Sequence, residues 1–397
     1  MTRNKQPERI VQAQVCEVAD CRRRLSLGLP AMRGDSRFPL TPEAAAMLVG
    51  KGVTVKIESG AALPIHYSDA AYQRRGAGIV SRAEALGCDI VLCTSALDAG
   101  DIRLMRRGAM LLTMSHAVSS DAGIVGLLAD RSVLALALDL IEDGHGNTPF
   151  ADILDEISGR AAVTVASAML ADPIGGKGVL MGGVAGIVPC EITVIGSGIA
   201  ASAAALAALG AGATVRMFDN DVYRLRDAVS ALGGAVISSA LHPHVLEGAL
   251  RSADVVIVTP LHHGFVAESD MVGVMKRGVA VFDLRRSRTP GVFPSMQVVD
   301  MACDPVPGVG NEAGRVCYVN VDSRVPRTVA MAMSNAVMTL VDDILGCDGC
   351  DKVDSALKML PGLRPSVITF LGKLVNREIG QVLGLRSVDI SLLISLS

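Results

Sequence analysis

From about residue 25 onward, short apolar runs alternate with amphipathic stretches along the chain. Such runs are typical of strands that are buried on both faces of a parallel sheet, and the stretches between them have the spacing of surface helices. In the first part of the chain we predict strands at 25–29, 53–57, 89–93, 109–114 and 133–136, and helices at 42–50, 119–128 and 152–170. Repeated strand and helix units predict an α/β fold with a mostly parallel sheet.

A second and more regular α/β run follows a glycine-rich segment at 175–186. It predicts strands at 191–195, 214–218, 235–237, 254–258 and 279–283, and helices at 199–209 and 222–232. After Pro326 the pattern becomes helical again, with predicted helices at 328–345 and 370–383 that we expect to join the first run. Residues 1–22 are polar without periodicity and are interpreted as an N-terminal extension. At 397 residues, the chain is long enough for two hydrophobic cores.

The composition narrows the kinds of partner that this chain suits. Apolar residues make up 50% of it and aromatic residues 3%, with no Trp, so aliphatic side chains and Met must build the cores. The formal net charge is -3, from 37 basic and 40 acidic residues, which gives no field that would attract nucleic acid or an anionic membrane. The longest weakly charged run, 178–215, is broken by Pro189, Glu191 and glycines, so we predict no membrane segment. We therefore expect a small-molecule ligand.

The cysteines and the N-terminus indicate a reducing compartment. The cysteine count is 9, an odd number of scattered residues that favours reduced thiols over a disulfide framework. Residues 1–10 contain no apolar stretch like that of a secretory signal, so we predict a cytoplasmic protein. Cys347 and Cys350 form a lone CxxC without a second ligand pair nearby in the sequence, so we predict no metal site.

A dinucleotide-binding turn begins the second α/β run. The predicted strand 191–195 leads directly into Gly196-Ser197-Gly198, and Asp219 closes the next predicted strand. In such a fingerprint the glycines let the backbone approach a pyrophosphate, and the acidic residue binds the ribose hydroxyls. A purely structural turn is the alternative, because glycines serve any turn that needs a positive φ. We assign cofactor binding to Gly196, Ser197, Gly198, Ile199, Ala201 and Asp219, with Ala201 as the small residue that packs the helix.

The charges near this turn bear on the choice of cofactor. Asp219 favours NAD, because its negative charge would repel the 2'-phosphate of NADP. Arg216 and Arg224 lie nearby in the sequence and leave NADP open. We predict NAD.

Further segments accompany the turn: Gly175-Gly176-Lys177-Gly178-Val179-Leu180-Met181-Gly182-Gly183-Val184, Arg37 with Leu40-Thr41-Pro42, Gly159-Arg160, and Val325-Pro326-Arg327-Thr328 with Asn335. Together they resemble alanine dehydrogenase and the pyridine nucleotide transhydrogenase alpha-subunit family, over about residues 25–390. The resemblance implies two Rossmann-like domains with doubly wound, mostly parallel sheets and a cleft between them. Residues 23–149 and 326–397 would form the substrate domain, and residues 150–325 the NAD-binding domain.

The same resemblance implies a reaction and an assembly. The reaction is reversible oxidative deamination of L-alanine, or of a related amino acid, to the 2-oxo acid and ammonia, with hydride passing to NAD. The assembly is a homo-oligomer, usually a hexamer. A soluble transhydrogenase subunit is a further interpretation, although the chain carries no membrane segments of that machine.

The resemblance also implies roles for residues outside the turn. Arg37 matches the arginine that binds the substrate carboxylate, and a planar guanidinium suits a bidentate carboxylate. His116 matches the catalytic histidine at a strand end, and Asn320 matches an asparagine that borders substrate and cofactor. Each residue type also has structural uses, since loop arginines are often solvated and a histidine after a strand is often hydrogen-bonded. His262 and His263 match no catalytic pair of the family and are interpreted as a loop beside the cofactor.

Two positions depart from the family pattern. The family's substrate-binding lysine aligns with Ser95, and its catalytic aspartate aligns with Ser287. If each lost group contributes roughly 10²- to 10⁴-fold, alanine turnover would fall to insignificance. We therefore keep two hypotheses: an NAD-dependent amino-acid dehydrogenase with an altered active site, and a catalytically impaired NAD(H)-binding homologue with a sensing or assembly role. Arg285, Arg286 and Arg288 are candidate replacement cations for a substrate carboxylate, with a solvated basic loop as the alternative.

Overall fold

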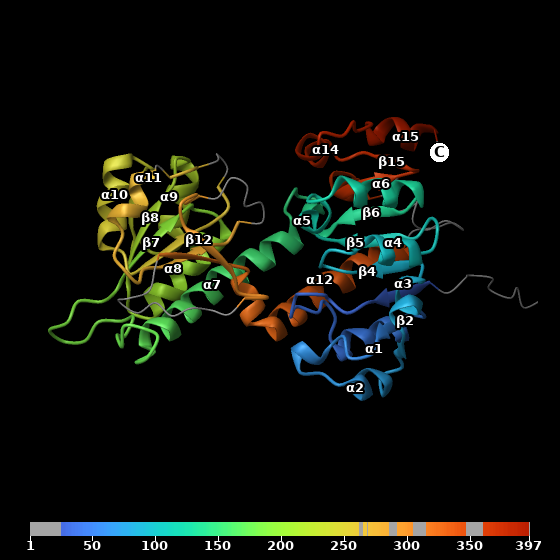
Figure 1. Ribbon diagram of the computed structural model, residues 1–397, viewed down its shortest axis with the longest axis horizontal. Helices are drawn as coiled ribbons and strands as arrows, with labels where there is room; N and C mark the ends of the chain where they lie inside the picture. The colour runs from blue at the N-terminus through green and yellow to red at the C-terminus, as the bar shows by residue number, and fades with distance from the viewer. Residues whose placement is uncertain are drawn as a thin grey trace, which may run out of the picture.

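The computed structural model describes residues 25–261, 265–267, 269–285, 292–304, 315–346 and 360–396. These residues form two lobes, each built around one sheet, and the long helices α7 and α12 run between them (Figure 1). The predicted α/β class with two mostly parallel sheets is confirmed. The N-terminal extension, Cys347 and Cys350 lie outside the described residues.

The first sheet orders eight strands as β15-β14-β6-β5-β4-β1-β2-β3. Its strands β1 to β6 pair in parallel, whereas β14 is antiparallel to both β6 and β15. The strands are β1 (Ser26–Leu29), β2 (Thr54–Glu58), β3 (Gly78–Val80), β4 (Ile90–Leu92), β5 (Met110–Thr113), β6 (Leu134–Ala137), β14 (Val367–Phe370) and β15 (Lys373–Leu374). The accompanying helices are α1 (Pro42–Gly50), α2 (Asp69–Gln73), α3 (Arg82–Leu86), α4 (Ala99–Leu104), α5 (Ser115–Val118), α6 (Ala122–Asp130), α12 (Pro326–Gly346), α14 (Arg377–Leu383) and α15 (Ile390–Leu396).

The second sheet orders seven parallel strands as β12-β13-β11-β10-β7-β8-β9. Its strands are β7 (Glu191–Ile195), β8 (Thr214–Phe218), β9 (Ile237–Ser239), β10 (Val255–Val258), β11 (Ala280–Asp283), β12 (Gln297–Asp300) and β13 (Val316–Val319), and its helices are α7 (Pro149–Ala171), α8 (Ile199–Gly210), α9 (Val222–Ala231), α10 (Pro243–Ser252) and α11 (Ser269–Val274). Every residue of β10, β11 and β13 is buried. This burial on both faces explains why these strands are uniformly apolar.

Three predicted elements were wrong in extent or type. The helix predicted at 119–128 begins later, at Ala122, because the Asp121 carboxylate accepts the N–H of Gly123 (2.7 Å) and caps α6, and the separate helix α5 ends before the predicted range. The helix predicted at 370–383 begins only at α14, since the residues before it form β14 and β15 around a turn in which Leu371 and Gly372 both have positive φ. The strand predicted at 235–237 lies at β9, two residues further on.

Helix α12 is long and apolar enough to cross a membrane by length and composition alone. Half of its apolar window is buried inside the fold, and the helix packs against α1 and α7. Val329, Met333 and Val337 along it belong to the core of the first lobe. Its apolar character is therefore accounted for by packing within the protein.

Helix α7 packs against α8 at unusually short range. A Cβ added at Gly159 would lie 2.2 Å from the carbonyl oxygen of Ala200 and 3.0 Å from the backbone nitrogen of Ala204. Only a residue without a side chain allows this approach. Since Ala200 is in the first turn of α8, Gly159 fixes where the N-terminus of α8 lies.

We expect Gly159→Ala to lower the free energy of unfolding by about 1–3 kcal/mol, because the added methyl group meets backbone that must shift. Urea denaturation followed by circular dichroism measures this change. Gly248→Ala in α10 is the matched control, because its added Cβ would meet nothing within 4 Å. In an exposed helix the control substitution should raise stability by roughly 0.5–1 kcal/mol. Equal effects of the two substitutions would contradict the close packing of α7 on α8.

Candidate active site between the two sheets

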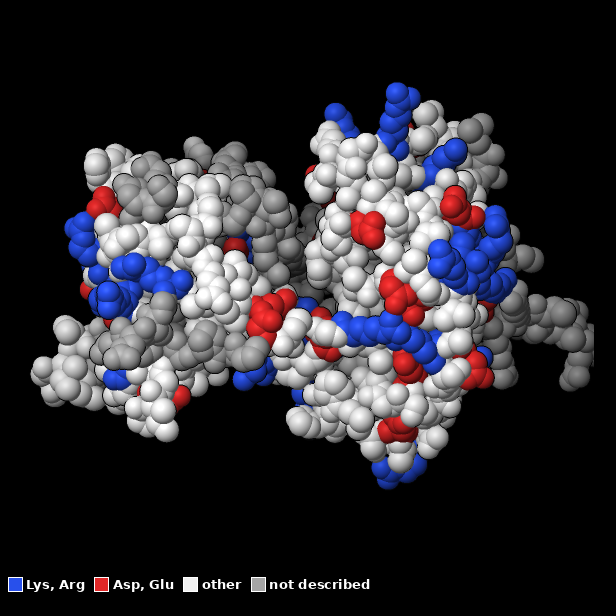
Figure 2. Space-filling view, viewed as in Figure 1, with Lys and Arg blue, Asp and Glu red and all other residues white. Residues whose placement is uncertain are grey.

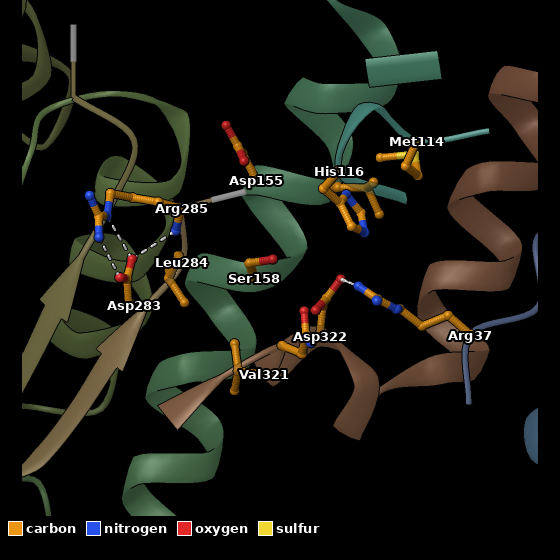
Figure 3. Close-up of a pocket in the computed structure, with 12 residues that line it drawn as sticks. Arg37, Met114, His116, Asp155, Ser158, Asp283, Leu284, Arg285, Val321 and Asp322 are labelled. Atoms are coloured by element: carbon orange, nitrogen blue, oxygen red, sulfur yellow. Dashed lines mark hydrogen bonds and ion pairs between the residues drawn. The ribbon is translucent and has the colours of Figure 1, made fainter. Parts of the chain in front are cut away.

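A cavity lies between the two lobes, and side chains from both sheets line it (Figure 3). From the first sheet, Arg37 follows β1, and Met114 and His116 follow β5. From the second sheet, three residues follow β11 (Asp283, Leu284 and Arg285) and three follow β13 (Asn320, Val321 and Asp322). Helix α7 contributes Leu154, Asp155 and Ser158. Carboxyl ends of parallel strands are the usual place for ligand sites in such sheets. The molecular surface is hollowed between the lobes, where acidic and basic side chains both gather (Figure 2).

Arg37 is held between two carboxylates. Its Nε and Nη2 donate to Asp35 at 2.5–3.0 Å, and its Nη1 donates to Asp322 Oδ2 at 2.7 Å. Burial alone would lower the pKa of the guanidinium, but the charges of Asp322 and Asp35 outweigh burial and raise it above the ordinary value. Arg37 thus lines the cavity, and because its side chain is only 17% exposed, it is not a solvated loop residue. Its role toward a substrate stays a prediction.

His116 lies in the first turn of α5, directly after β5, and its ring points toward the Arg37–Asp322 pair (Figure 3). The preceding residue, Ser115, donates its backbone N–H to Asp139 Oδ1 (2.8 Å) and its hydroxyl to Asp139 Oδ2 (2.5 Å). Asp139 is 4% exposed and follows the neighbouring strand β6. A buried carboxylate therefore anchors the turn that presents His116.

Asn320 lines the cavity at the carboxyl end of β13. It has left-handed backbone (φ 55°, ψ 38°), a conformation that asparagine tolerates better than most residues. Its Nδ2 donates to both carboxylate oxygens of Asp300, at 2.8 and 2.7 Å. The amide is thereby held in one orientation at the cavity wall.

Ser95, the position that the resemblance aligns with the family's lysine, lines neither this cavity nor the apolar pocket beside it. Its hydroxyl lies 3.6 Å from the sulfur of Met32 and 3.6 Å from that of Cys93, and the residue is 9% exposed. The neighbouring Thr94 faces the apolar pocket instead. Burial raises the pKa of the Cys93 thiol to about 11, so this sulfur is a packed thiol and not a nucleophile.

Several predicted residues cannot be placed. Ser287, Arg286, Arg288, His262 and His263 lie outside the described residues. Arg285 is described, and its Nε and Nη2 donate to the two oxygens of Asp283 at 2.9 and 2.7 Å. Arg285 therefore reaches the cavity wall as one half of an ion pair.

Sequence reasoning missed other lining residues. Asp155 and Ser158 come from α7, where nothing in the helical pattern distinguishes them. Asp283 and Asp322 carried a usable signal, since Asp283 ends the buried parallel strand β11 and Asp322 follows three residues after the buried parallel strand β13. In the part of the chain that the structure describes, no group of three or more His, Cys, Asp and Glu residues could hold a metal ion.

An apolar pocket joins the cavity at four shared residues, Arg37, Met114, His116 and Leu154. Its remaining lining consists of Phe38, Pro39, Thr94, Val329 and Met333. Most residues that line the pocket are therefore apolar, whereas most residues that line the cavity are polar or charged.

The dinucleotide turn follows β7 on the second sheet. Gly196 has φ 116°, and a Cβ there would lie 2.0 Å from Thr259 Oγ1, so this glycine is required by the turn itself. At Gly198 an added Cβ would meet nothing closer than Arg224 Nη2 at 3.4 Å, so the backbone there is open to a ligand. Ile199 is 44% exposed at the start of α8. Ala201 is fully buried, which suits its predicted packing role.

The acidic partner of the turn is in place. Asp219 follows β8, is 6% exposed, and accepts the hydroxyl of Ser197 at 2.7 Å and the N–H of Asp221 at 2.9 Å. Of the two nearby cations, Arg216 pairs with Glu191 at 3.3 Å, and Arg224 is exposed beside the turn.

The turn and the cavity share one edge of the second sheet. Strands β7, β8 and β9 follow one another in one direction, whereas β10, β11 and β13 follow in the other, so the strand order reverses between β7 and β10. Ligands of doubly wound sheets bind at the carboxyl ends of the strands beside this point. The turn after β7 lies on one side of it, and the cavity residues after β11 and β13 lie on the other.

Comparison with known proteins identifies the family. The chain matches "Alanine dehydrogenase/PNT, N-terminal domain" over residues 31–159 and "Alanine dehydrogenase/PNT, C-terminal domain" over residues 162–377. The chain belongs to the alanine dehydrogenase/PNT family. It is 28% identical to alanine dehydrogenase of Mycobacterium tuberculosis over 368 residues, covering 91% of this chain and 97% of the relative. It is also 28% identical to alanine dehydrogenase of Staphylococcus saprophyticus over 373 residues, covering 92% and 98%.

Solved structures share the fold. An L-alanine dehydrogenase superposes with a TM-score of 0.78 at 25% identity, covering 91% of this chain and 99% of that one. A transhydrogenase from Sinorhizobium meliloti superposes with a TM-score of 0.69 at 19% identity, covering 89% and 99%. The family resemblance that the sequence carries is thus confirmed for both halves of the chain.

We expect Asp139→Ala to destabilise the protein by about 1–3 kcal/mol, because it leaves the partly buried N–H and hydroxyl of Ser115 without their acceptor. Chemical denaturation measures the loss. Asp139→Asn is the matched variant: it keeps one carbonyl acceptor of the same shape, so its loss should be smaller. Identical losses in the two variants would show that the hydrogen bonds to Ser115 do not hold this turn.

Proposed function

We propose that the protein is an NAD-dependent amino-acid dehydrogenase, which catalyses reversible oxidative deamination of an amino acid to the 2-oxo acid and ammonia. One observation carries the proposal: Arg37, His116 and Asn320 line a single cavity at the carboxyl edge that also bears the dinucleotide turn. The alanine dehydrogenases to which the chain is similar support the choice of reaction. A homo-oligomeric assembly and a cytoplasmic location stay predictions.

The residues present suit NAD. The N-terminal turn of α8 offers backbone N–H groups without a capping side chain, which favours a pyrophosphate, and the open backbone at Gly198 permits its approach. Asp219 and Ser197 would hold the adenosine ribose through its hydroxyls. When bound, the oxidised nicotinamide supplies the acceptor for the hydride that leaves the substrate Cα.

The residues of the cavity provide the remaining functions. Arg37 retains two of its five N–H donors for a substrate carboxylate, because the bonds to Asp35 and Asp322 use three. His116 would accept the proton that the substrate ammonium group loses as the Cα–H leaves as hydride. Water then adds to the resulting iminium carbon and ammonium departs, so one amino acid, one NAD⁺ and one water give one 2-oxo acid, one NH₄⁺, one NADH and one proton. Asn320, held by Asp300, would keep the reacting carbon in position.

A catalytically impaired NAD(H)-binding homologue is the second candidate. The side chain of Ser95 contacts Met32 and does not line the cavity, so this position supplies no cation in place of the lysine that the family resemblance implies there. In this case NADH would bind without turnover of any amino acid.

We expect NADH to bind, and Asp219→Ala to weaken its binding by at least tenfold while reducing discrimination against NADPH, because the ribose hydroxyls lose their acceptor. Fluorescence of NADH measures the affinity without interference, since the chain has no Trp. Asp221→Asn is the control, because Asp221 caps α9 and an asparagine preserves the cap. If Asp219→Ala leaves the affinities for both nucleotides unchanged, the assignment of the ribose site is incorrect.

Measurement of NADH formation tests the proposed dehydrogenase activity directly. Mixing the protein with NAD and a panel of L-amino acids should produce NADH absorbance at a rate that His116→Asn lowers by roughly 10²- to 10⁴-fold, with NADH affinity retained. The loss reflects removal of the proton acceptor. Absence of turnover with every amino acid, together with tight NADH binding, would favour the second candidate.

A further inference from the structure

Arg37 reaches the cavity with a carboxylate already attached to it. Asp322 Oδ2 accepts Arg37 Nη1 at 2.7 Å, and the Asp322 side chain is 8% exposed. Among the described residues, the other oxygen of Asp322 accepts no hydrogen bond, and Asp322 lines the cavity. The cavity wall therefore presents a guanidinium with N–H donors that Asp35 and Asp322 do not use, next to a carboxylate with one oxygen that Arg37 does not use.

This pair suits one kind of ligand head group. A 2-oxo acid anion on Arg37 lies beside the like charge of Asp322, which opposes its binding. An α-amino acid carries a carboxylate and an ammonium group on one carbon, so it places opposite charges on both members of the pair. The pair thus favours a zwitterion over an anion.

The apolar pocket adds a requirement on the side chain. Phe38, Pro39, Val329 and Met333 line it beside Arg37, and its cavity volume is about 30 Å³. At about 10–15 Å³ for each water-sized group, that volume holds two or three such groups. The methyl group of alanine would leave most of this apolar space unfilled.

We propose that Arg37 and Asp322 bind the carboxylate and the ammonium group of an L-amino acid whose aliphatic side chain places two or three carbon atoms in this pocket. Norvaline, valine and leucine meet this description. This proposal rests on the proposed function, which supplies the reaction. It adds Asp322 as the residue that binds the ammonium group, and it adds a class of substrates larger than alanine.

A series of graded side chains tests the pocket. L-Alanine, L-2-aminobutyrate, L-norvaline, L-leucine and L-phenylalanine would be compared by kcat/KM for NADH formation. Each buried methylene group should raise kcat/KM roughly fourfold up to norvaline or leucine, after which phenylalanine should fall. A maximum at alanine would overturn the proposal.

Substitutions that fill the pocket should change which side-chain length gives the highest kcat/KM in this series. Val329→Ile and Met333→Phe add volume to two buried lining positions, so each should move the optimum toward shorter side chains. Val329→Ile adds a single methylene group and keeps the test available if Met333→Phe does not fold. An unchanged order of substrates in the folded variants would overturn the assignment of the pocket.

Asp322→Asn tests the head-group pair. The substitution should raise the KM for the amino acid by roughly 10- to 100-fold, because a charge-assisted hydrogen bond to the ammonium group is lost. The KM for the matching 2-oxo acid, measured in reverse with NADH and saturating ammonium, should stay the same or fall. A merely structural role would move both constants in parallel and would overturn the proposal.

Asp35→Asn is the matched control, because Asp35 also pairs with Arg37 but does not line the cavity. Its effects on the two KM values should be similar to each other. If Asp155→Asn separates the two constants and Asp322→Asn does not, the ammonium site lies on α7 and the proposal is wrong.

Calorimetry separates failure of this proposal from failure of the proposed function. L-Norvaline and 2-oxopentanoate would be titrated into the NADH-loaded protein and into its Asp322→Asn variant. Tighter binding of norvaline, weakened at least tenfold in the variant, supports the proposal even if no amino acid turns over. Binding of alanine alone, or a preference for the oxo acid, overturns it while leaving the dehydrogenase proposal intact.

Discussion

The contact of α7 with α8 sets the geometry on which the candidate site depends. The first turns of α7 bury Phe150 and Leu154 in the core of the first lobe, and its later turns bury Ala162 and Ala166 in the core of the second. The same helix lines the cavity and meets the backbone of Ala200 at Gly159. One rigid element therefore fixes the distance between the residues around Arg37 and the helix that bears the dinucleotide turn. A side chain at position 159 would lengthen that distance, because the obstacle is backbone.

Charge in the cavity is arranged in pairs. Arg37 pairs with Asp35 and Asp322, and Arg285 pairs with Asp283, so neither described arginine of the wall is an isolated cation. The attraction of the partner carboxylates offsets part of the cost of removing these guanidinium groups from water. The arrangement also means that a ligand competes with resident carboxylates for the arginines. Selection among ligands then depends on whether they bring a positive charge of their own.

Local features of the sequence predicted the glycine turn after β7 and its surroundings well. The turn at Gly196–Gly198, the small residue Ala201 and the acidic end of β8 all lie within one short stretch, and each has a geometric reason that applies in any such unit. The family resemblance placed Arg37, His116 and Asn320 on one cavity wall. The pairing of Arg37 with Asp322 was beyond reach, because the two residues are 285 positions apart and nothing in either segment marks the other.

Other features depended on packing that sequence patterns do not encode. β14 is short, and its strand conformation comes from pairing with β6, more than 200 residues earlier; the apolar pattern predicted no strand there. The family resemblance predicts that Ser95 stands where the family has a lysine, whereas the direction of its side chain toward Met32 follows from the core around Cys93. The residue type at a family position and the orientation of its side chain are separate questions. Because the backbone turns this position into the core, the residues that decide which ligand binds are those that still face the cavity, and Asp322 is the acidic one that contacts Arg37.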